Sequence, residues 1–152
     1  KYNPISKRAP YDYGMRTPIM FKWKGKITPE LDDRTLVSSL DMLPTVLDLV
    51  GVKPPGELDG INVLNQTELI NREAVFGEIY AHDFNTVNES LFYQIAITEP
   101  YKLIIPNKTY KPNEKIQLFD IFKDPHEQED LALKHPDIVK DLTNKIEESW
   151  NK

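Results

Sequence analysis

The second half of the chain contains four short segments rich in β-branched and aromatic residues, separated by turn residues. We predict strands at Ala74–Tyr80, Leu91–Ile97, Tyr101–Ile105 and Lys115–Asp120. The dipeptide Glu99-Pro100 and the stretch 106–114 have the composition of hairpin turns. Four consecutive strands with short links predict an antiparallel meander.

A final helix is predicted after His135, because Pro136 suits a first helical position, where a missing N–H costs little. The residues that follow place an apolar stripe on one helix face, and these are Ile138, Val139, Leu142, Ile146 and Trp150. We expect this stripe to lie across one face of the sheet.

The first half of the chain has a different pattern. The nearly continuous apolar run Ile19–Trp23 predicts a strand covered on both faces. A helix with one buried face is predicted after it from the spacing of Leu43, Val46, Leu47 and Val50. Ser38, Ser39 and Asp41 are candidate N-caps, and Gly51 is placed to end the helix. Together with the sheet, these elements predict an α+β fold.

Composition narrows the function classes. The chain has 152 residues, with 19 Lys and Arg against 24 Asp and Glu, for a formal net charge of −5. No basic excess is available to neutralise nucleic-acid phosphates or to bind anionic membranes, so neither partner is expected. With no cysteine in the chain, disulfides, thiolate metal sites and a Cys nucleophile within it are excluded. No apolar run reaches the ~18 residues of a membrane helix, and Lys1–Pro4 is not a signal peptide.

Several motifs occur in a fixed order along the chain. They are Lys7-Arg8-Ala9-Pro10-Tyr11-Asp12-Tyr13-Gly14-Met15-Arg16-Thr17-Pro18, Ser38–Gly51, Leu58-Asp59-Gly60-Ile61, Tyr101-Lys102-Leu103-Ile104, Leu118-Phe119-Asp120-Ile121, Asp124-Pro125-His126-Glu127, and Leu131-Ala132 with His135-Pro136. In this order and spacing the chain resembles the C-terminal portion of a type I sulfatase, of the arylsulfatase-like branch of the alkaline phosphatase superfamily.

The resemblance implies an architecture of two parts. Residues 1–72 would be the C-terminal strand-loop-helix part of the large α/β domain. Residues 73–152 would form a small four-stranded antiparallel sheet packed with a C-terminal helix. The strand Ile19–Trp23 and the predicted helix would normally pack against the rest of the large domain, so we expect the chain alone to expose apolar surface and to self-associate.

The resemblance also implies sulfate-ester hydrolysis by the full-length enzyme. Sulfatases use a formylglycine nucleophile made from Cys or Ser in a C/S-x-P-x-R motif, together with a divalent cation, usually calcium. Both would lie upstream of Lys7, and no such motif occurs here. We therefore expect the chain alone to bind neither cofactor and to be inactive. The family implies a sulfated small molecule or carbohydrate as substrate, and a periplasmic or secreted location.

Lys7 matches the family lysine that sits at the sulfate, and it is the candidate catalytic residue. Tyr11 and Asp12 are expected to pin the loop so that Lys7 points inward. Arg16 precedes the predicted buried strand, where a bidentate partner would satisfy it; contact with substrate is the alternative. His82 and Asp83 follow a predicted strand, and they are candidate substrate contacts, with an ordinary loop role as the alternative.

Other residues favour structural roles. We interpret Asp41 as a helix cap rather than a catalytic acid, and Asp59-Gly60 as a turn. The three histidines are far apart in the sequence, so no metal site is predicted within the chain. Two alternative functions remain. One is a phosphoesterase of the same superfamily, disfavoured because no histidine is followed by Gly. The other is a non-catalytic carbohydrate-binding or interaction module.

Overall fold

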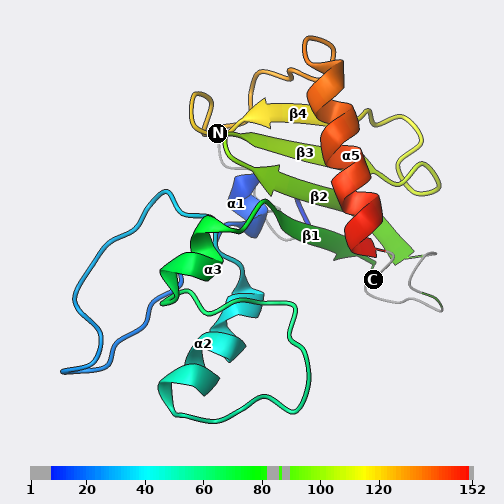
Figure 1. The fold of residues 1–152 in the computed structure, drawn as a ribbon. Helices are drawn as coiled ribbons and strands as arrows, with labels where there is room; N and C mark the ends of the chain where they lie inside the picture. The colour runs from blue at the N-terminus through cyan, green and yellow to red at the C-terminus, as the bar shows by residue number, and fades with distance from the viewer. Residues whose placement is uncertain (1–7, 82–85, 87–89, 151–152) are drawn as a thin grey trace. The chain divides into compact units, whose positions relative to one another are not determined.

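The computed structural model describes residues 8–81, 86 and 90–150, and these form two compact units (Figure 1). The sheet unit combines the described parts of residues 1–16 and 76–152. The connecting unit comprises residues 17–75. In the described part of the chain, no helix has the length and apolar character needed to cross a bilayer.

The sheet unit is built on four antiparallel strands in the order β1-β2-β3-β4, as predicted (Figure 1). The strands are β1 (Val75–Tyr80), β2 (Leu91–Thr98), β3 (Tyr101–Pro106) and β4 (Gln117–Asp120). Tyr101 at the start of β3 pairs with Thr98 on β2 and with Asp120 on β4. The sheet is therefore a meander, with its central strands β2 and β3 joined by a tight turn.

One face of the sheet is covered by helix α5 (Pro136–Trp150). Its buried residues Leu142 and Ile146 pack against Ala96, Leu103 and Leu118, which are neighbours in register on β2, β3 and β4. The predicted final helix and its apolar stripe are thus confirmed. Successive side chains of a strand point to opposite faces, so the residues next to these three along each strand must be covered on the other side.

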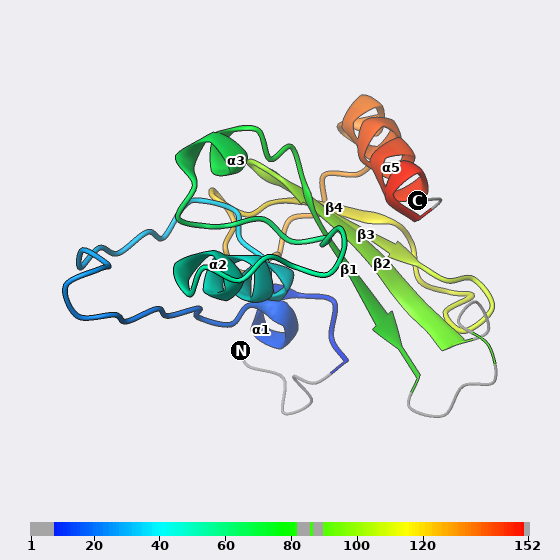
Figure 2. The ribbon, with the colours of Figure 1, turned by 60° about the horizontal axis from the view of Figure 1, so that its bottom comes forward.

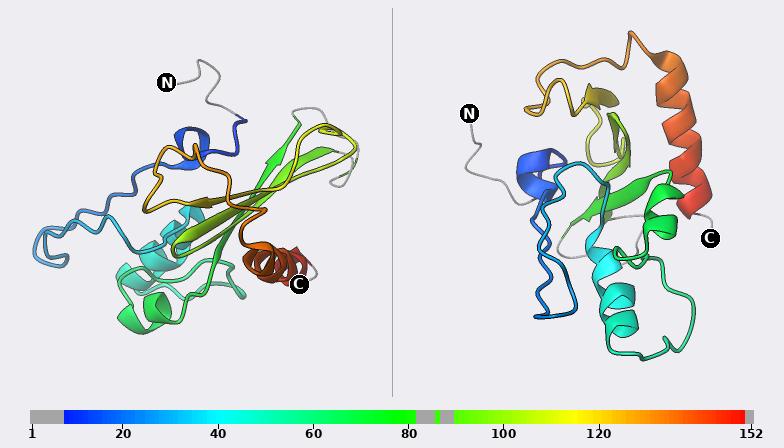
Figure 3. Two further views of the ribbon diagram at one scale, coloured as in Figure 1. Left: turned by 90° about the horizontal axis from the view of Figure 1, so that it is seen from above. Right: turned by 60° about the vertical axis from the view of Figure 1, so that its left-hand side comes forward.

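Helix α1 (Asp12–Met15) supplies part of that cover, on the face of the sheet opposite α5 (Figures 2 and 3). Tyr11 and Met15 pack there against a second buried cluster, formed by Tyr93, Ile95, Ile104 and Phe119. This short helix was not predicted, since four residues are too few to show helical periodicity. Its placement on the sheet anchors the described residues that follow Lys7 in the sequence.

The connecting unit contains the helix predicted from the spacing of Leu43 and its partners. A 3-10 turn, η1 (Ser39–Asp41), leads into α2 (Met42–Leu49), and a short α3 (Gln66–Ile70) follows. Ser38 and Asp41 form a capping box at the start. Gly51 follows the helix with a φ of 70°, which is the left-handed conformation that glycine adopts without strain. The predicted cap and the predicted end are both confirmed.

The predicted strand Ile19–Trp23 is wrong. Residues 16–23 form no regular secondary structure, and the Met20 side chain is 83% exposed. A strand needs a neighbour to pair with its N–H and C=O groups, and among the described residues no strand is paired with this segment. The segment has the apolar composition of a strand, but it is not hydrogen-bonded into a sheet. The boundary between residues 72 and 73, which concerns domains of the full-length protein, stays a prediction.

Candidate functional site: the segment that follows Lys7

Three of the four predicted site residues, Lys7, His82 and Asp83, lie outside the described residues. The described chain begins at Arg8, directly after Lys7 in the sequence. Arg8 has a φ of 71°, in the left-handed region that a side chain makes unfavourable. Of the candidate site, the structure therefore describes the segment from Arg8 to Arg16.

Tyr11 attaches this segment to the edge of the sheet. Its hydroxyl donates a hydrogen bond to Gln117 Oε1 on β4 at 2.9 Å, and its ring meets the buried Phe119 ring edge-on, with centroids 6.2 Å apart. Burial raises the pKa of the Tyr11 phenol, although the hydrogen bond to Gln117 acts in the opposite direction. The phenol therefore stays protonated and keeps its role as a donor.

Asp12, the first residue of α1, attaches the segment to the middle of the sheet. Its carboxylate oxygen Oδ1 lies 2.8 Å from the ammonium nitrogen of Lys102 on β3. The same nitrogen lies 2.6 Å from Glu127 Oε1. The second oxygen of Glu127 accepts a hydrogen bond from the backbone N–H of Asp12 at 2.7 Å. We call Asp12, Lys102 and Glu127 the ionic triad.

The ionic triad is largely withdrawn from water. The side chain of Lys102 is 0% exposed, that of Glu127 is 2% exposed, and that of Asp12 is 22% exposed. The Lys102–Glu127 contact is an ion pair without the alignment of a hydrogen bond. The sequence predicted that Tyr11 and Asp12 pin this loop, and these contacts are the interactions that hold the two residues on the sheet unit. The direction in which Lys7 points stays a prediction.

Close packing holds the other end of α1. A Cβ atom placed on Gly77 of β1 would lie 2.7 Å from the terminal methyl of Met15. Only glycine at position 77 leaves this methyl its place without a shift of the side chain. The three attachments of Tyr11, Asp12 and Met15 fix both ends of a four-residue helix that could not be stable by itself.

Arg16 ends α1, and its backbone N–H donates to the Asp12 carbonyl at 2.8 Å. Its side chain is exposed, and within the described part of the chain it makes no ion pair. The predicted bidentate partner is therefore not found among these residues. Whether Arg16 contacts substrate stays a prediction.

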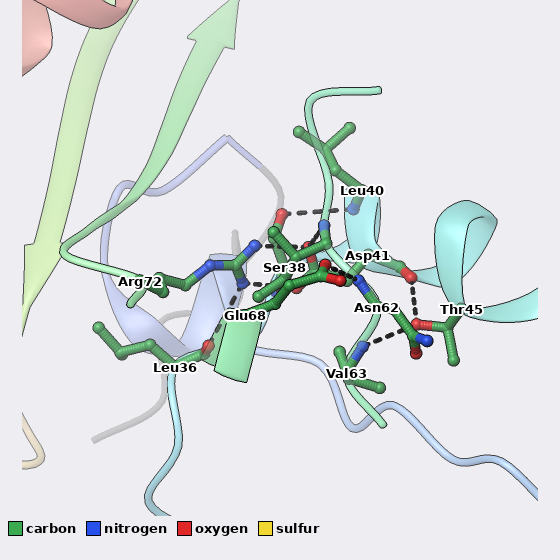
Figure 4. A network of polar contacts seen from close by, with 10 residues as sticks. Leu36, Ser38, Leu40, Asp41, Thr45, Asn62, Val63, Glu68 and Arg72 are labelled. Atoms are coloured by element: carbon green, nitrogen blue, oxygen red, sulfur yellow. Dashed lines mark hydrogen bonds and ion pairs between the residues drawn. The ribbon is translucent and has the colours of Figure 1, made fainter. Parts of the chain in front are cut away.

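A separate polar network orders the connecting unit around Asp41 (Figure 4). Arg72 binds Asp41 through two nitrogens, each 2.6 Å from one carboxylate oxygen. The backbone N–H groups of Ser38 and Ile61 donate to the same carboxylate at 2.7 and 2.9 Å. Burial alone would raise the pKa of Asp41, but these hydrogen bonds and the Arg72 charge outweigh it and lower the pKa.

The geometry makes Asp41 a structural residue, as the sequence predicted. One guanidinium and two backbone amides stabilise the ionised carboxylate. Asp41 is therefore not suited to act as an acid or a base near neutral pH. Thr45 extends the network by donating to the Asp41 carbonyl and accepting from the Val63 N–H. Gly60 is required beside it, because a Cβ there would lie 2.2 Å from the Leu40 carbonyl oxygen.

The described residues contain no ready-made set of metal ligands. Among residues 8–81, 86 and 90–150, no group of three or more His, Asp or Glu side chains is arranged to hold a metal ion. The carboxylates of Asp12 and Glu127 are both paired with the Lys102 ammonium.

The family model described as "N-sulphoglucosamine sulphohydrolase, C-terminal" matches residues 2–152. The chain belongs to this family. Arylsulfatase K of Bos taurus is 26% identical over 153 residues, a match that covers 96% of this chain and 27% of the relative. An uncharacterized sulfatase of Schizosaccharomyces pombe is 32% identical over 145 residues, covering 91% of this chain and 25% of the relative. The chain thus spans about a quarter of these relatives' length.

Solved structures show the same fold. One, from work on the metabolism of multiple glycosaminoglycans by Bacteroides thetaiotaomicron, is 26% identical, with a TM-score of 0.62 over 79% of this chain and 27% of its own. Another, solved with its substrate D-glucosamine-2-N,6-O-disulfate, is 23% identical, with a TM-score of 0.54 over 73% of this chain and 23% of its own. The phosphonate monoester hydrolase of Agrobacterium radiobacter has a TM-score of 0.52 at 20% identity over 69% of this chain and 23% of its own. The α+β fold and the resemblance to sulfatases are confirmed.

Sequence reasoning missed the roles of Lys102, Glu127 and Arg72. A signal for Lys102 was present, since it lies within the apolar strand 101–105 and faces the same side as Ile104. A charged residue at a buried strand position needs a partner of opposite charge. No local pattern points to Asp12, however, because the two residues are 90 positions apart in the sequence.

Proposed function

We propose that the full-length protein containing this chain hydrolyses sulfate esters and that Lys7 contacts the sulfate group. The observation that carries the proposal is the match of a sulfohydrolase C-terminal family to residues 2–152. The structure supports it by attaching the segment that follows Lys7 to a rigid sheet at Tyr11, Asp12 and Met15.

The chemistry suits a lysine. Cleavage of a sulfate ester builds negative charge on the leaving oxygen and on the non-bridging oxygens. A fixed ammonium nearby stabilises this charge more in the transition state than in the ground state. The lysine ammonium is a compact point charge on a flexible stem, so it can follow the charge as it moves toward the leaving oxygen.

The nucleophile and the metal are assigned to other segments of the full-length protein. The chain contains no cysteine, and its described residues hold no cluster suited to a metal ion. Formylglycine and calcium are therefore proposed on family resemblance alone. In the proposal, the 152-residue chain by itself turns over no sulfate ester.

A sulfated carbohydrate is the proposed substrate class. A protein of the same fold was solved with D-glucosamine-2-N,6-O-disulfate as its substrate. Arg16, His82 and Asp83 are proposed to contribute to the substrate pocket of the full-length protein. A periplasmic or secreted location is proposed on the same family grounds.

Phosphoester hydrolysis is the second candidate, because a phosphonate monoester hydrolase shares the fold. Sulfate monoesters carry one negative charge and phosphate monoesters about two at neutral pH, so parallel assays distinguish the two reactions. We expect turnover of the sulfate ester to exceed that of the matching phosphate ester. A reversed preference would overturn the assignment. Saccharide binding without turnover of either ester would instead identify a non-catalytic module.

The role of Lys7 is tested in the full-length protein with Lys7→Ala. We expect kcat for an aryl sulfate and for a sulfated disaccharide to fall by about 10²–10³-fold, the usual loss when one transition-state donor is removed. The matched control is Lys140→Ala, which removes an exposed lysine from α5. A Lys7→Ala enzyme with the kcat of the control would overturn the proposed role.

A further inference from the structure

We propose that Lys102 and Glu127 are positioning residues for the proposed reaction: acting through Asp12, they hold the segment from Arg8 to Arg16, which directly follows Lys7 in the sequence. This inference rests on the proposed function, since it concerns the residue proposed to contact the sulfate. It assigns a role in the reaction to two residues that stand 95 and 120 positions from Lys7 in the sequence.

The burial of Lys102 is the first argument. A lysine with 0% of its side chain exposed is costly to bury. Stability alone is served as well or better by an apolar residue of similar size, so a buried ion pair is weak evidence of a stabilising role. On this face of β3 the neighbour Ile104 belongs to an apolar cluster. A charged residue here gains specificity of position rather than stability.

The placement of Lys102 in the sheet is the second argument. It pairs with Ile97 on β2 and with Phe119 on β4, so its backbone is fixed from both sides. The ammonium reaches Asp12 Oδ1 at 2.8 Å, and Glu127 reaches the Asp12 N–H at 2.7 Å. Lys102 on β3 therefore holds the side chain of Asp12, and Glu127 holds its backbone.

Backbone strain at two positions is the third argument. Among the described residues, the non-glycine residues with positive φ are Arg8, at 71°, and Glu127, at 52°. The left-handed conformation costs free energy for any residue with a side chain, and it persists only where the surroundings impose it. One of the two directly follows Lys7, and the other belongs to the ionic triad. Strain thus occurs at both ends of the proposed linkage.

The chain length makes the linkage effective. Four residues separate Lys7 from Asp12, so the stretch of chain that joins them can span at most about 18 Å. A displacement of about 1 Å at a catalytic group can reduce a rate 10²-fold. Release of Asp12 would therefore misplace the ammonium without changing its chemistry.

The test compares four forms of the full-length protein, namely wild type, Lys7→Ala, Lys102→Met and the double variant. We expect Lys102→Met to lower kcat by about 10–100-fold, as loss of a supporting group commonly does. We expect Lys7→Ala with Lys102→Met to be no slower than Lys7→Ala alone, because a misplaced Lys7 and a missing one are equivalent. A purely structural lysine would instead give effects that multiply.

Controls separate positioning from folding. Lys123→Met removes another lysine–carboxylate ion pair of the sheet unit, at an 86% exposed side chain, and it should leave kcat within about threefold of wild type. Lys102→Arg keeps the charge and should recover part of the loss. Should Lys102→Met fold poorly, Glu127→Gly offers a second route. It relieves the strained φ and removes the carboxylate, while Lys102 keeps Asp12 as a counter-ion, and we expect lower kcat from a chain that still folds.

Each outcome decides a separate question. A Lys7→Ala enzyme with unchanged kcat overturns the proposed function and this inference together. An impaired Lys7→Ala enzyme with a multiplicative Lys102→Met effect, or with no Lys102→Met effect, overturns the inference alone. Faster amide hydrogen exchange at Asp12 and Arg16 in Lys102→Met, with the rest of the sheet unit unchanged, is the expected structural result. Unchanged exchange there would also count against the inference.

Discussion

The two compact units are held together by different kinds of interaction. In the sheet unit, apolar side chains fill both faces of the sheet, and several of them, such as Ala96, Leu103 and Leu118, are fully buried. In the connecting unit, the described residues that reach full burial are Asp41 and Thr45, both polar. Most of the large apolar side chains that are exposed also lie in this unit.

The difference shows which unit buries an apolar core by itself. Burial of apolar surface is the main favourable term in folding, at roughly 25 cal/mol per Å². The sheet unit gains this term within itself. The connecting unit relies on a network of hydrogen bonds that includes the Arg72–Asp41 ion pair, and a single hydrogen bond contributes little net free energy. Its apolar stripe on α2, with Leu43 at 55% and Val50 at 54% exposure, remains available for a cover.

The largest expected effect compares one leucine from each unit. Leu142→Ala on α5 removes a fully buried side chain and should lower the free energy of unfolding by about 2–5 kcal/mol. Leu43→Ala on α2 removes a half-exposed side chain and should change it by about 0.5 kcal/mol or less. Urea unfolding of the chain, followed by far-UV circular dichroism, measures both. Equal losses would mean that Leu43 is covered in solution.

A smaller effect is expected from breaking the polar network. Arg72→Met leaves the Asp41 carboxylate buried without its guanidinium, which should cost about 3 kcal/mol within the connecting unit. The amides of Ile61 and Val63 donate to Asp41 and Thr45, so their hydrogen exchange reports the network directly. We expect faster exchange at both. Arg34→Met, at an exposed arginine of the same unit, is the matched control and should change neither.

Acid provides an independent check on this network. The pKa of Asp41 is lower in the folded chain than its ordinary value of about 3.9. The network therefore contributes its full stability above about pH 4 and loses it as the pH falls through the lowered pKa. Protection of the Ile61 amide should fall over that range and should become independent of pH in Asp41→Asn. Constant protection in the wild type would contradict the role assigned to Asp41.

The sequence was a good guide where local periodicity decides the structure. The four strands and the stripe of α5 follow from alternation and from helical spacing, and the structure confirms them within two or three residues. Ser38, Asp41 and Gly51 were predictable because capping is local chemistry. Tyr11 and Asp12 were predictable as anchors only through the resemblance to a family.

The rest could not be predicted, because it depends on distant residues. The run Ile19–Trp23 has the composition of a strand, but a strand exists only beside another one, and composition does not reveal its neighbour. Lys102 and Glu127 meet Asp12 across the fold, and no short motif connects them. The short helix α1 is stabilised by the sheet rather than by its own sequence.

The smallest expected effect is self-association of the isolated chain through the stripe on α2. Leu43 and Val46 on this helix, and Val50 directly after it, are each 43–55% exposed. Association would remove them from water, but the stripe is much smaller than the roughly 1,000 Å² of a stable interface. We therefore expect weak association that grows with concentration, measured as a rise in average mass by light scattering.

The comparison between the units predicts which substitution abolishes this association. Val46→Glu places a charge in the middle of the stripe and should return the chain to a monomer at every concentration. Leu133→Glu alters a single leucine of the sheet unit that is 97% exposed, and it should leave the association unchanged because an isolated apolar side chain is no patch. Two results would contradict this prediction: a wild-type chain that stays monomeric at every concentration, or association that is lost in Leu133→Glu instead. Either would show that the chain does not associate through the exposed stripe.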